Sequence, residues 1–373
     1  MLMLKKTIAA LSLLSILAAC QNDENPSQPE PKPRQDINLT RAEQEFMDKG
    51  TDFAFRFFDQ VCSTEKEKPN VFVSPLSASL CLSMITNGAT DNTLAEMQDV
   101  LGFPANTFSL DDLNNYNQKL TSALLDLDNT TQLGIANSIW IEEGFKVYDS
   151  FVDVNKKMYD AQVQELDFTS PTAKDMINQW CATQTNNCIK EVIQEIPADV
   201  RMYLINALYF KGIWKSQFDK SATGQDNFTN VDGSQQKVAM MNQTATFNYT
   251  QTDDFSIAEL PYGNEAFSMV ILLPSGDKTL DESLPSLNYE NWKQWSKNMV
   301  GKELQIKLPR FKVEYDKELE EDMIAMGMKD AFDAYKAKFA NMSGAELYIG
   351  LLQQFTYINV DEEGTEAAAV TVG

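Results

Sequence analysis

The chain has 373 residues, 43% of them hydrophobic, which is enough for one large domain or two ordinary ones. Its formal net charge of −23 excludes a nucleic-acid binder, because phosphate contacts need clustered Lys and Arg. The sequence has no histidine, which excludes Ser-His-Asp and Cys-His catalysis and His-containing zinc sites in their usual forms. Two Ser-x-x-Lys matches, at 63–66 and 234–237, lack the partner motifs of that chemistry and are ascribed to chance. We therefore expect a protein that is not an enzyme and binds no cofactor or metal.

Residues 1–19 predict a signal peptide. Two lysines precede an apolar run, 7–19, that is about 20 Å long as a helix and too short for a hydrocarbon core of about 30 Å. The run ends in Leu-Ala-Ala-Cys, which resembles a bacterial lipobox, and the resemblance implies that Cys20 is lipidated and becomes the first mature residue. An ordinary cleavage site with an incidental cysteine is the alternative.

Residues 20–38 predict a lipidated N-terminus followed by a polar, proline-rich spacer that cannot form a core. No aspartate follows Cys20 directly, so we expect a lipoprotein of the outer membrane of a Gram-negative bacterium, in contact with the membrane through its lipid. Asp23 and Glu24 favour exposure at the cell surface.

The body of the chain begins with an amphipathic helix over about 43–61, whose apolar residues recur every three or four positions. A short strand is predicted over 70–74, followed by a helix that Ser74 caps and Pro75 opens. Further along, 135–141 and 204–214 are apolar enough for buried strands, and 268–274 is one of two apolar strands around a turn. No linker is visible after residue 38, so 39–373 is predicted to form one domain.

The order of these motifs resembles the serpin family. The residues that carry the resemblance are Asn70, Ser74, Pro75, Ser77, Gly88, Ala89 and Thr93, then 135–141, Asp167, Phe168, Ile177, Asn178, Trp180, Thr185, 204–214, Phe218, 308–311 and 319–332. The resemblance covers about residues 40–373. It implies a mixed α+β serpin fold, with three β-sheets, about eight or nine helices and a large central sheet A that accepts the reactive loop.

The last stretch of the chain resembles the hinge of the serpin reactive loop, which enters a sheet as an extra strand. The hinge residues are Glu362, Glu363, Gly364, Thr365, Glu366, Ala367, Ala368, Ala369 and Thr371. Side chains alternate in a strand, so Thr365, Ala367, Ala369 and Thr371 would form one face, small enough to slide between existing strands and buried after insertion. Gly364 would let the hinge bend. From this stretch alone, a frayed C-terminal tail is an equal alternative.

The resemblance also implies a sheet-opening region, formed by Ser74, Ser77, Asn206, Trp214, Arg310 and Gln354. Arg310 is expected to pair with Glu362. The family commonly has histidine where this chain has Gln354, an amide that can still donate and accept hydrogen bonds. The family's Gly-Lys after the helix that crosses the sheet is replaced by Asn187-Cys188.

The function implied is that of a monomeric suicide inhibitor of serine or cysteine endopeptidases, whose partner is the target protease. The hinge 362–373 would insert into the central sheet and trap the protease as an acyl-enzyme. The alternative is a non-inhibitory or truncated, inactive serpin that acts as a binding module. The scissile bond and the buried strands that follow it in the family would lie beyond Gly373, so the sequence leaves the target unidentified.

Four cysteines remain after Cys20, namely Cys62, Cys81, Cys181 and Cys188. Cys181 and Cys188 are two helical turns apart, about 10 Å of rise, which is too far for a disulfide if both are helical. Free thiols are favoured, although a cell envelope permits disulfides.

Overall fold

A computed structural model describes residues 32–104 and 106–373. The predicted signal peptide, Cys20, Asp23 and Glu24 lie outside these residues. Within the two described ranges, no helix is both long and apolar enough to cross a membrane.

The described residues contain nine α-helices and eleven strands. The helices are α1 (Arg41–Thr64), α2 (Pro75–Thr86), α3 (Asp91–Leu101), α4 (Leu110–Asp126), α5 (Asp149–Tyr159), α6 (Ala173–Gln184), α7 (Leu280–Ser283), α8 (Tyr289–Lys297) and α9 (Glu320–Met326). The strands are β1 (Gln132–Glu142), β2 (Gln162–Leu166), β3 (Met202–Ile213), β4 (Gly224–Thr229), β5 (Gln235–Gln251), β6 (Phe255–Pro261), β7 (Ser268–Pro274), β8 (Val300–Pro309), β9 (Phe311–Glu318), β10 (Gln353–Val360) and β11 (Gly364–Val372).

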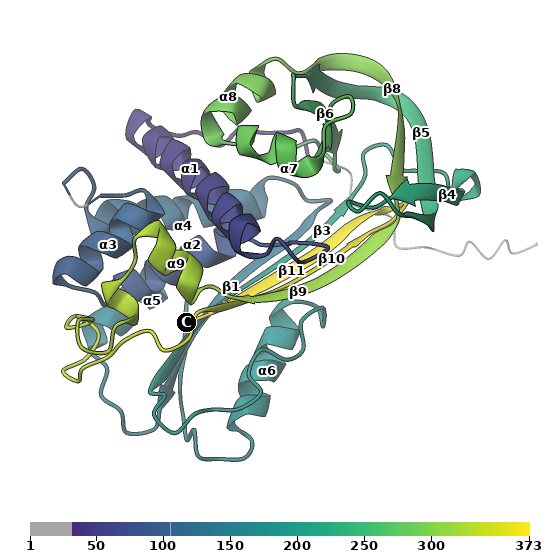
Figure 1. Cartoon of the computed structure of the whole chain (residues 1–373). Coiled ribbons are helices and arrows are strands. Elements are labelled where there is room, and N and C mark those ends of the chain that lie inside the picture. Colours follow the sequence, from purple (N-terminus) through teal and green to yellow (C-terminus); the bar gives the residue numbers. More distant parts are fainter. Residues whose placement is uncertain (1–31, 105) are drawn as a thin grey trace, which may run out of the picture.

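The large sheet, sheet A, has six strands in the order β2-β1-β3-β11-β10-β9. Helices α1 to α5 and α9 gather on one side of it, and α6 lies across the other side (Figure 1). The last strand of the chain, β11, therefore lies in the middle of the sheet between strands from two distant parts of the sequence.

The second sheet has five strands, with β4, β5, β6 and β7 in order and β8 also paired with β5. Strand β5 is 17 residues long. Its first part pairs with β4, its last part pairs with β6, and β8 pairs along its middle. One long strand thus joins two groups of strands, and the described residues form two sheets where three were expected. The mixed α+β serpin architecture itself is confirmed.

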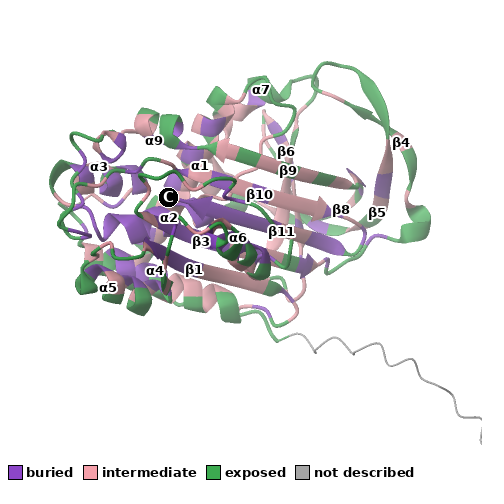
Figure 2. Cartoon of the chain, turned by 90° about the horizontal axis from the view of Figure 1, so that it is seen from below, coloured by how far each residue is buried: buried purple, intermediate pink, exposed green. Residues whose placement is uncertain are grey.

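Sheet A separates two apolar cores. On the helical side, Phe53 and Phe57 of α1 pack with Leu80 and Met84 of α2, and all four side chains are buried. On the other side, α6 contributes Ile177 and Cys181 to a smaller core, whose remaining members come mostly from β3 and β11. Both faces of the middle of the sheet are therefore covered (Figure 2).

Local chemistry explains the two helix starts that matter most. The Thr40 hydroxyl accepts from the Glu43 amide and the Glu43 carboxylate accepts from the Thr40 amide, which is a capping box at α1. Ser74 caps α2 by accepting from the Ser77 amide at 3.3 Å, with proline in the first turn, as predicted.

The predicted strand over 70–74 is wrong. This segment pairs with no described strand, and the Phe72 carbonyl instead accepts from the Thr356 hydroxyl at 2.7 Å.

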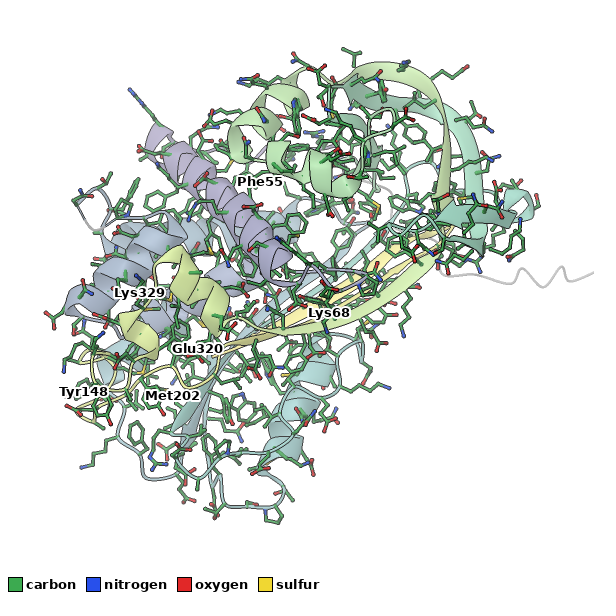
Figure 3. The ribbon with its side chains drawn as sticks, viewed as in Figure 1. Phe55, Lys68, Tyr148, Met202, Glu320 and Lys329 are labelled. Carbon is green, nitrogen blue, oxygen red and sulfur yellow. The ribbon has the colours of Figure 1, made fainter. Side chains whose placement is uncertain are left out.

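Two labelled residues show how helices are placed around sheet A. Phe55 projects from α1 toward α8, where its ring lies 6.3 Å from that of Trp292 (Figure 3). Glu320 marks the point where β9 runs into α9 (Figure 3). Helix α9 ends at Gly327, which has a left-handed φ of 121°, so the predicted helix over 319–332 is interrupted there.

Candidate functional site: the inserted hinge strand

The hinge residues form β11, a strand paired on both of its sides. It is antiparallel to β3 from Gly364 opposite Ile213 to Val372 opposite Ile205. It is also antiparallel to β10, from Thr365 opposite Val360 to Val372 opposite Gln353. Figure 2 shows the strand as one of the most buried in the sheet. The stretch predicted to be a hinge or a frayed tail is therefore an integral strand of sheet A.

Burial along β11 is more extensive than the expected small-residue face. Thr365, Ala369 and Thr371 are buried as expected, whereas Ala367 is only half-buried. The opposite face carries Ala368, Val370 and Val372, which are also buried, since they pack in the core beneath α6. A helix across this sheet was predicted from the sequence, but its cover over this face of the hinge was not. The predicted helix could have indicated that Val370 and Val372 are buried, because a helix that crosses the sheet covers one of its faces.

Gly364 has a different role from the one expected. Its φ lies outside the left-handed region, so the position does not need glycine for a bend. Instead, a Cβ at this position would lie 2.0 Å from the Gly212 carbonyl oxygen and 3.0 Å from the Ile213 Cα. Glycine is required because the backbones of β3 and β11 approach too closely for any side chain.

An ion pair stands where the hinge enters the sheet. Arg310, between β8 and β9, donates to the Glu362 carboxylate at 2.5 Å, and the Thr223 hydroxyl donates to the same oxygen at 2.7 Å. Burial alone would raise the pKa of Glu362, but the hydrogen bonds from Arg310 and Thr223 outweigh it and hold that pKa below its ordinary value. The pairing expected of Arg310 is present, and Thr223 was not identified from the sequence.

An aromatic pair lies beside this ion pair. The Trp214 indole stacks on Tyr262 with ring centroids 4.5 Å apart, and its N–H donates to the Asp361 carbonyl at 2.8 Å. The Tyr262 hydroxyl donates to the Thr365 hydroxyl at 2.6 Å. Glu363, in contrast, is exposed and pairs with Lys220. In the sequence Tyr262 only ends the first of two apolar strands around a turn, and the tertiary structure gives it a contact with the hinge.

A buried polar network joins β11 to α2 and β10. The Thr371 hydroxyl lies 2.9 Å from the Ser77 hydroxyl and accepts from the Gln354 side-chain amide at 2.9 Å. Gln354 also accepts from the Ser74 amide at 2.7 Å and donates to the Ser74 carbonyl at 3.0 Å. The amide therefore satisfies three partners without a titratable ring. Asn206 lies opposite Thr371 in the ladder, but its side chain donates to Asn137 at 2.9 Å and stays outside this network.

The four cysteines of the described residues are free thiols, which agrees with the favoured interpretation. Cys181 is buried on α6, and Cys188 lies four residues beyond the end of that helix. Burial raises the pKa of Cys181 to about 12 and that of Cys188 to about 11, so both remain protonated and unreactive at neutral pH.

Comparisons of the chain with known protein families, sequences and structures agree with this geometry. A family model described as "Serpin (serine protease inhibitor)" matches residues 48–373. Serpin B6 of Macaca fascicularis is 36% identical over 81% of this chain and 82% of its own length, and leukocyte elastase inhibitor of Xenopus tropicalis is 34% identical over 87% and 88%. The crystal structure of tengpin, a thermophilic serpin in the latent state, is 32% identical and matches with a TM-score of 0.82 over 91% of this chain and 90% of that one. The chain belongs to the serpin family, whose members are generally protease inhibitors and not enzymes.

Proposed function

We propose that this protein is a suicide inhibitor of endopeptidases of the serine class, with cysteine endopeptidases as a second target class. The observation that carries the proposal is the double pairing of β11, with small or apolar residues at every buried position except two threonines whose hydroxyls are bonded. In such an inhibitor the protease cleaves an exposed loop and is held as an acyl-enzyme while the hinge inserts. The family model and one of the relatives carry inhibitor names, which supports the same assignment for this chain.

The energy available from insertion is large enough for this mechanism. A new strand of about ten residues, at about 1 kcal/mol net per hydrogen bond, contributes on the order of 10 kcal/mol. That is comparable with the whole stability of an ordinary domain, about 5–15 kcal/mol. A form with the hinge outside the sheet is therefore metastable and must be held by a kinetic barrier.

The test uses the protein expressed from its own gene, incubated with a panel of serine and cysteine proteases. We expect a detergent-stable covalent complex with at least one of them. The protease should cleave Thr365→Arg at the bond that it cleaves in the wild type, but no covalent complex should form. The reason is that the buried site of residue 365 against Tyr262 cannot accept a guanidinium. The matched control is Thr229→Arg, which makes the same change on the exposed strand β4.

Two outcomes would overturn the proposal. If Thr365→Arg trapped protease as well as the wild type, insertion of this strand would not be the trapping step. If the wild type bound proteases reversibly or was only cleaved, the alternative of a non-inhibitory binding module would be favoured.

We also propose that the protein is anchored in the outer membrane through lipid on Cys20. The support is the sequence pattern of 1–20 and the polar spacer that follows it. Metabolic labelling with a fatty acid should mark the wild type, and Cys20→Ser should remain unlabelled and leave the membrane fraction. Equal labelling of both would exclude this cysteine as the anchor.

A further inference from the structure

One charged residue interrupts the small and apolar pattern of β11. Glu366 lies on the same face as Ala368, Val370 and Val372, the face that packs beneath α6. Its side chain is only 24% exposed. Burying a carboxylate costs free energy unless it is paired or hydrogen-bonded. The sheet must therefore supply partners for Glu366 when β11 inserts.

Three groups receive the Glu366 carboxylate. The Tyr209 hydroxyl of β3 donates to its Oε1 at 2.6 Å, and the Asn186 side-chain amide donates to the same oxygen at 3.4 Å. Lys211, directly opposite Glu366 in the ladder, places its Nζ 4.0 Å away. Burial and the neighbouring carboxylate raise the pKa of Tyr209, so its hydroxyl keeps the proton that it donates.

These groups come from two different parts of the fold. Tyr209 and Lys211 belong to β3, whereas Asn186 belongs to the loop that follows α6. This loop makes a left-handed turn, with φ of 48° at Asn186 and 62° at Asn187. Asn186 also donates to the Tyr209 hydroxyl at 3.2 Å, so the loop, β3 and β11 meet at one point.

We propose that Glu366 is a positioning residue that fastens the loop after α6 onto the inserted strand. The carboxylate arrives only when β11 is in the sheet, so the contact couples insertion of the hinge to closure of α6 over it. Without Glu366, Tyr209 and Asn186 still contact each other, but the loop loses its hydrogen bond from Asn186 to β11. The contact opposes withdrawal of the strand, because the loop and α6 must first be released.

The first test measures amide hydrogen exchange in this chain and does not need a protease. Tyr209→Phe removes only the hydroxyl, and Glu366→Ala removes the carboxylate. Each should speed exchange of the Asn187 amide, which is bonded to the Ala182 carbonyl at 2.7 Å, and of the Cys188 amide, bonded to the Thr185 carbonyl at 2.9 Å. We expect an increase of about tenfold, the ratio that corresponds to losing roughly one hydrogen bond to a charged group.

A matched control and a double variant sharpen this test. Glu314→Gln removes a carboxylate from the same face of sheet A, on the edge strand β9, and should leave exchange of the loop unchanged. The double variant Tyr209→Phe with Glu366→Ala removes both partners of the Asn186 amide, whereas each single variant leaves one, so its loop should exchange at least as fast as that of the faster single variant. Circular dichroism confirms that each variant folds. Unchanged loop exchange in Tyr209→Phe and Glu366→Ala, or an equal increase in Glu314→Gln, would overturn the proposal.

The consequence for inhibition rests on the proposed function and has a separate readout. Glu366→Ala should still form the covalent protease complex, but the complex should release active protease about tenfold faster than that of the wild type. If no variant and no wild type forms a complex, the inhibitory function fails while the exchange measurements still decide the role of Glu366. If complexes form and Glu366→Ala releases protease at the wild-type rate, the contact does not oppose withdrawal and that part of the proposal is wrong.

Discussion

The sharpest structural prediction concerns Gly364, where β11 begins. Replacing it with alanine adds one methyl group that would lie 2.0 Å from the Gly212 carbonyl oxygen and 2.9 Å from the Gly212 carbonyl carbon. All the crowded atoms belong to the backbone of β3, so no side chain can rotate away. Either the two backbones move apart or the first pair of the ladder, Gly364 with Ile213, is broken.

The magnitude follows from that choice. Overpacking by one methyl group typically costs about 1–3 kcal/mol, and a rigid backbone neighbour places this site near the upper end. At about 2.1 cal/mol/K of unfolding entropy per residue, 1 kcal/mol shifts the melting temperature of a domain of roughly 335 residues by about 1.4 °C, so we expect Gly364→Ala to unfold roughly 3–4 °C below the wild type. Thermal unfolding followed by circular dichroism measures the difference.

The matched control is Gly224→Ala, at the start of β4. Nothing lies within 4 Å of the added methyl group there, and its φ is not left-handed. This variant should be unchanged or more stable by less than about 1 kcal/mol, because alanine restricts the unfolded chain. If Gly364→Ala were as stable as Gly224→Ala, the close approach of β11 to β3 would be refuted as the reason for glycine at position 364.

Three further predictions concern the contacts that hold β11. Thr371→Val removes a fully buried hydroxyl that contacts Ser77 and Gln354, and it should lower the free energy of unfolding in urea by about 1–3 kcal/mol. Urea unfolding curves with the same midpoint and slope for the variant and the wild type would contradict the network. The pKa of Glu362 is lowered from 4.5, so its contribution to stability is complete above that pH and is lost as the pH falls through the lower folded value. In Arg310→Gln, burial without the cation raises the folded pKa of Glu362, so the stability lost on acidification should shrink or become a gain, and identical pH profiles of unfolding would exclude the ion pair. The Gln354→His variant should be most stable at neutral pH, and its free energy of unfolding should fall below about pH 6.5, because a protonated ring cannot accept a hydrogen bond from the Ser74 amide. A stability profile with pH that is parallel to that of the wild type would show that position 354 does not need an acceptor.

The sequence by itself determined the family and most of the elements. Ordered motifs such as Ser74-Pro75 and 204–214 predicted a capped helix and a buried strand, because capping and apolar periodicity are local properties of the chain. The small residues of the hinge fit a strand that lies between others, but from that stretch alone a frayed tail was an equal alternative, and the resemblance of the rest of the chain favoured the hinge. The pairing of Arg310 with Glu362 was predicted only through the resemblance to the family, since the two residues lie 52 positions apart.

Only the tertiary structure decided how the hinge is held. Gly364 could be read from the sequence as a bend, and the close backbone of Gly212 that actually requires glycine comes from another strand. Tyr209 and Asn186 become partners of Glu366 because the register of β3 against β11 and the turn after α6 bring them together. Contacts of this kind depend on register and on packing between segments far apart in the chain, which no local pattern of residues specifies.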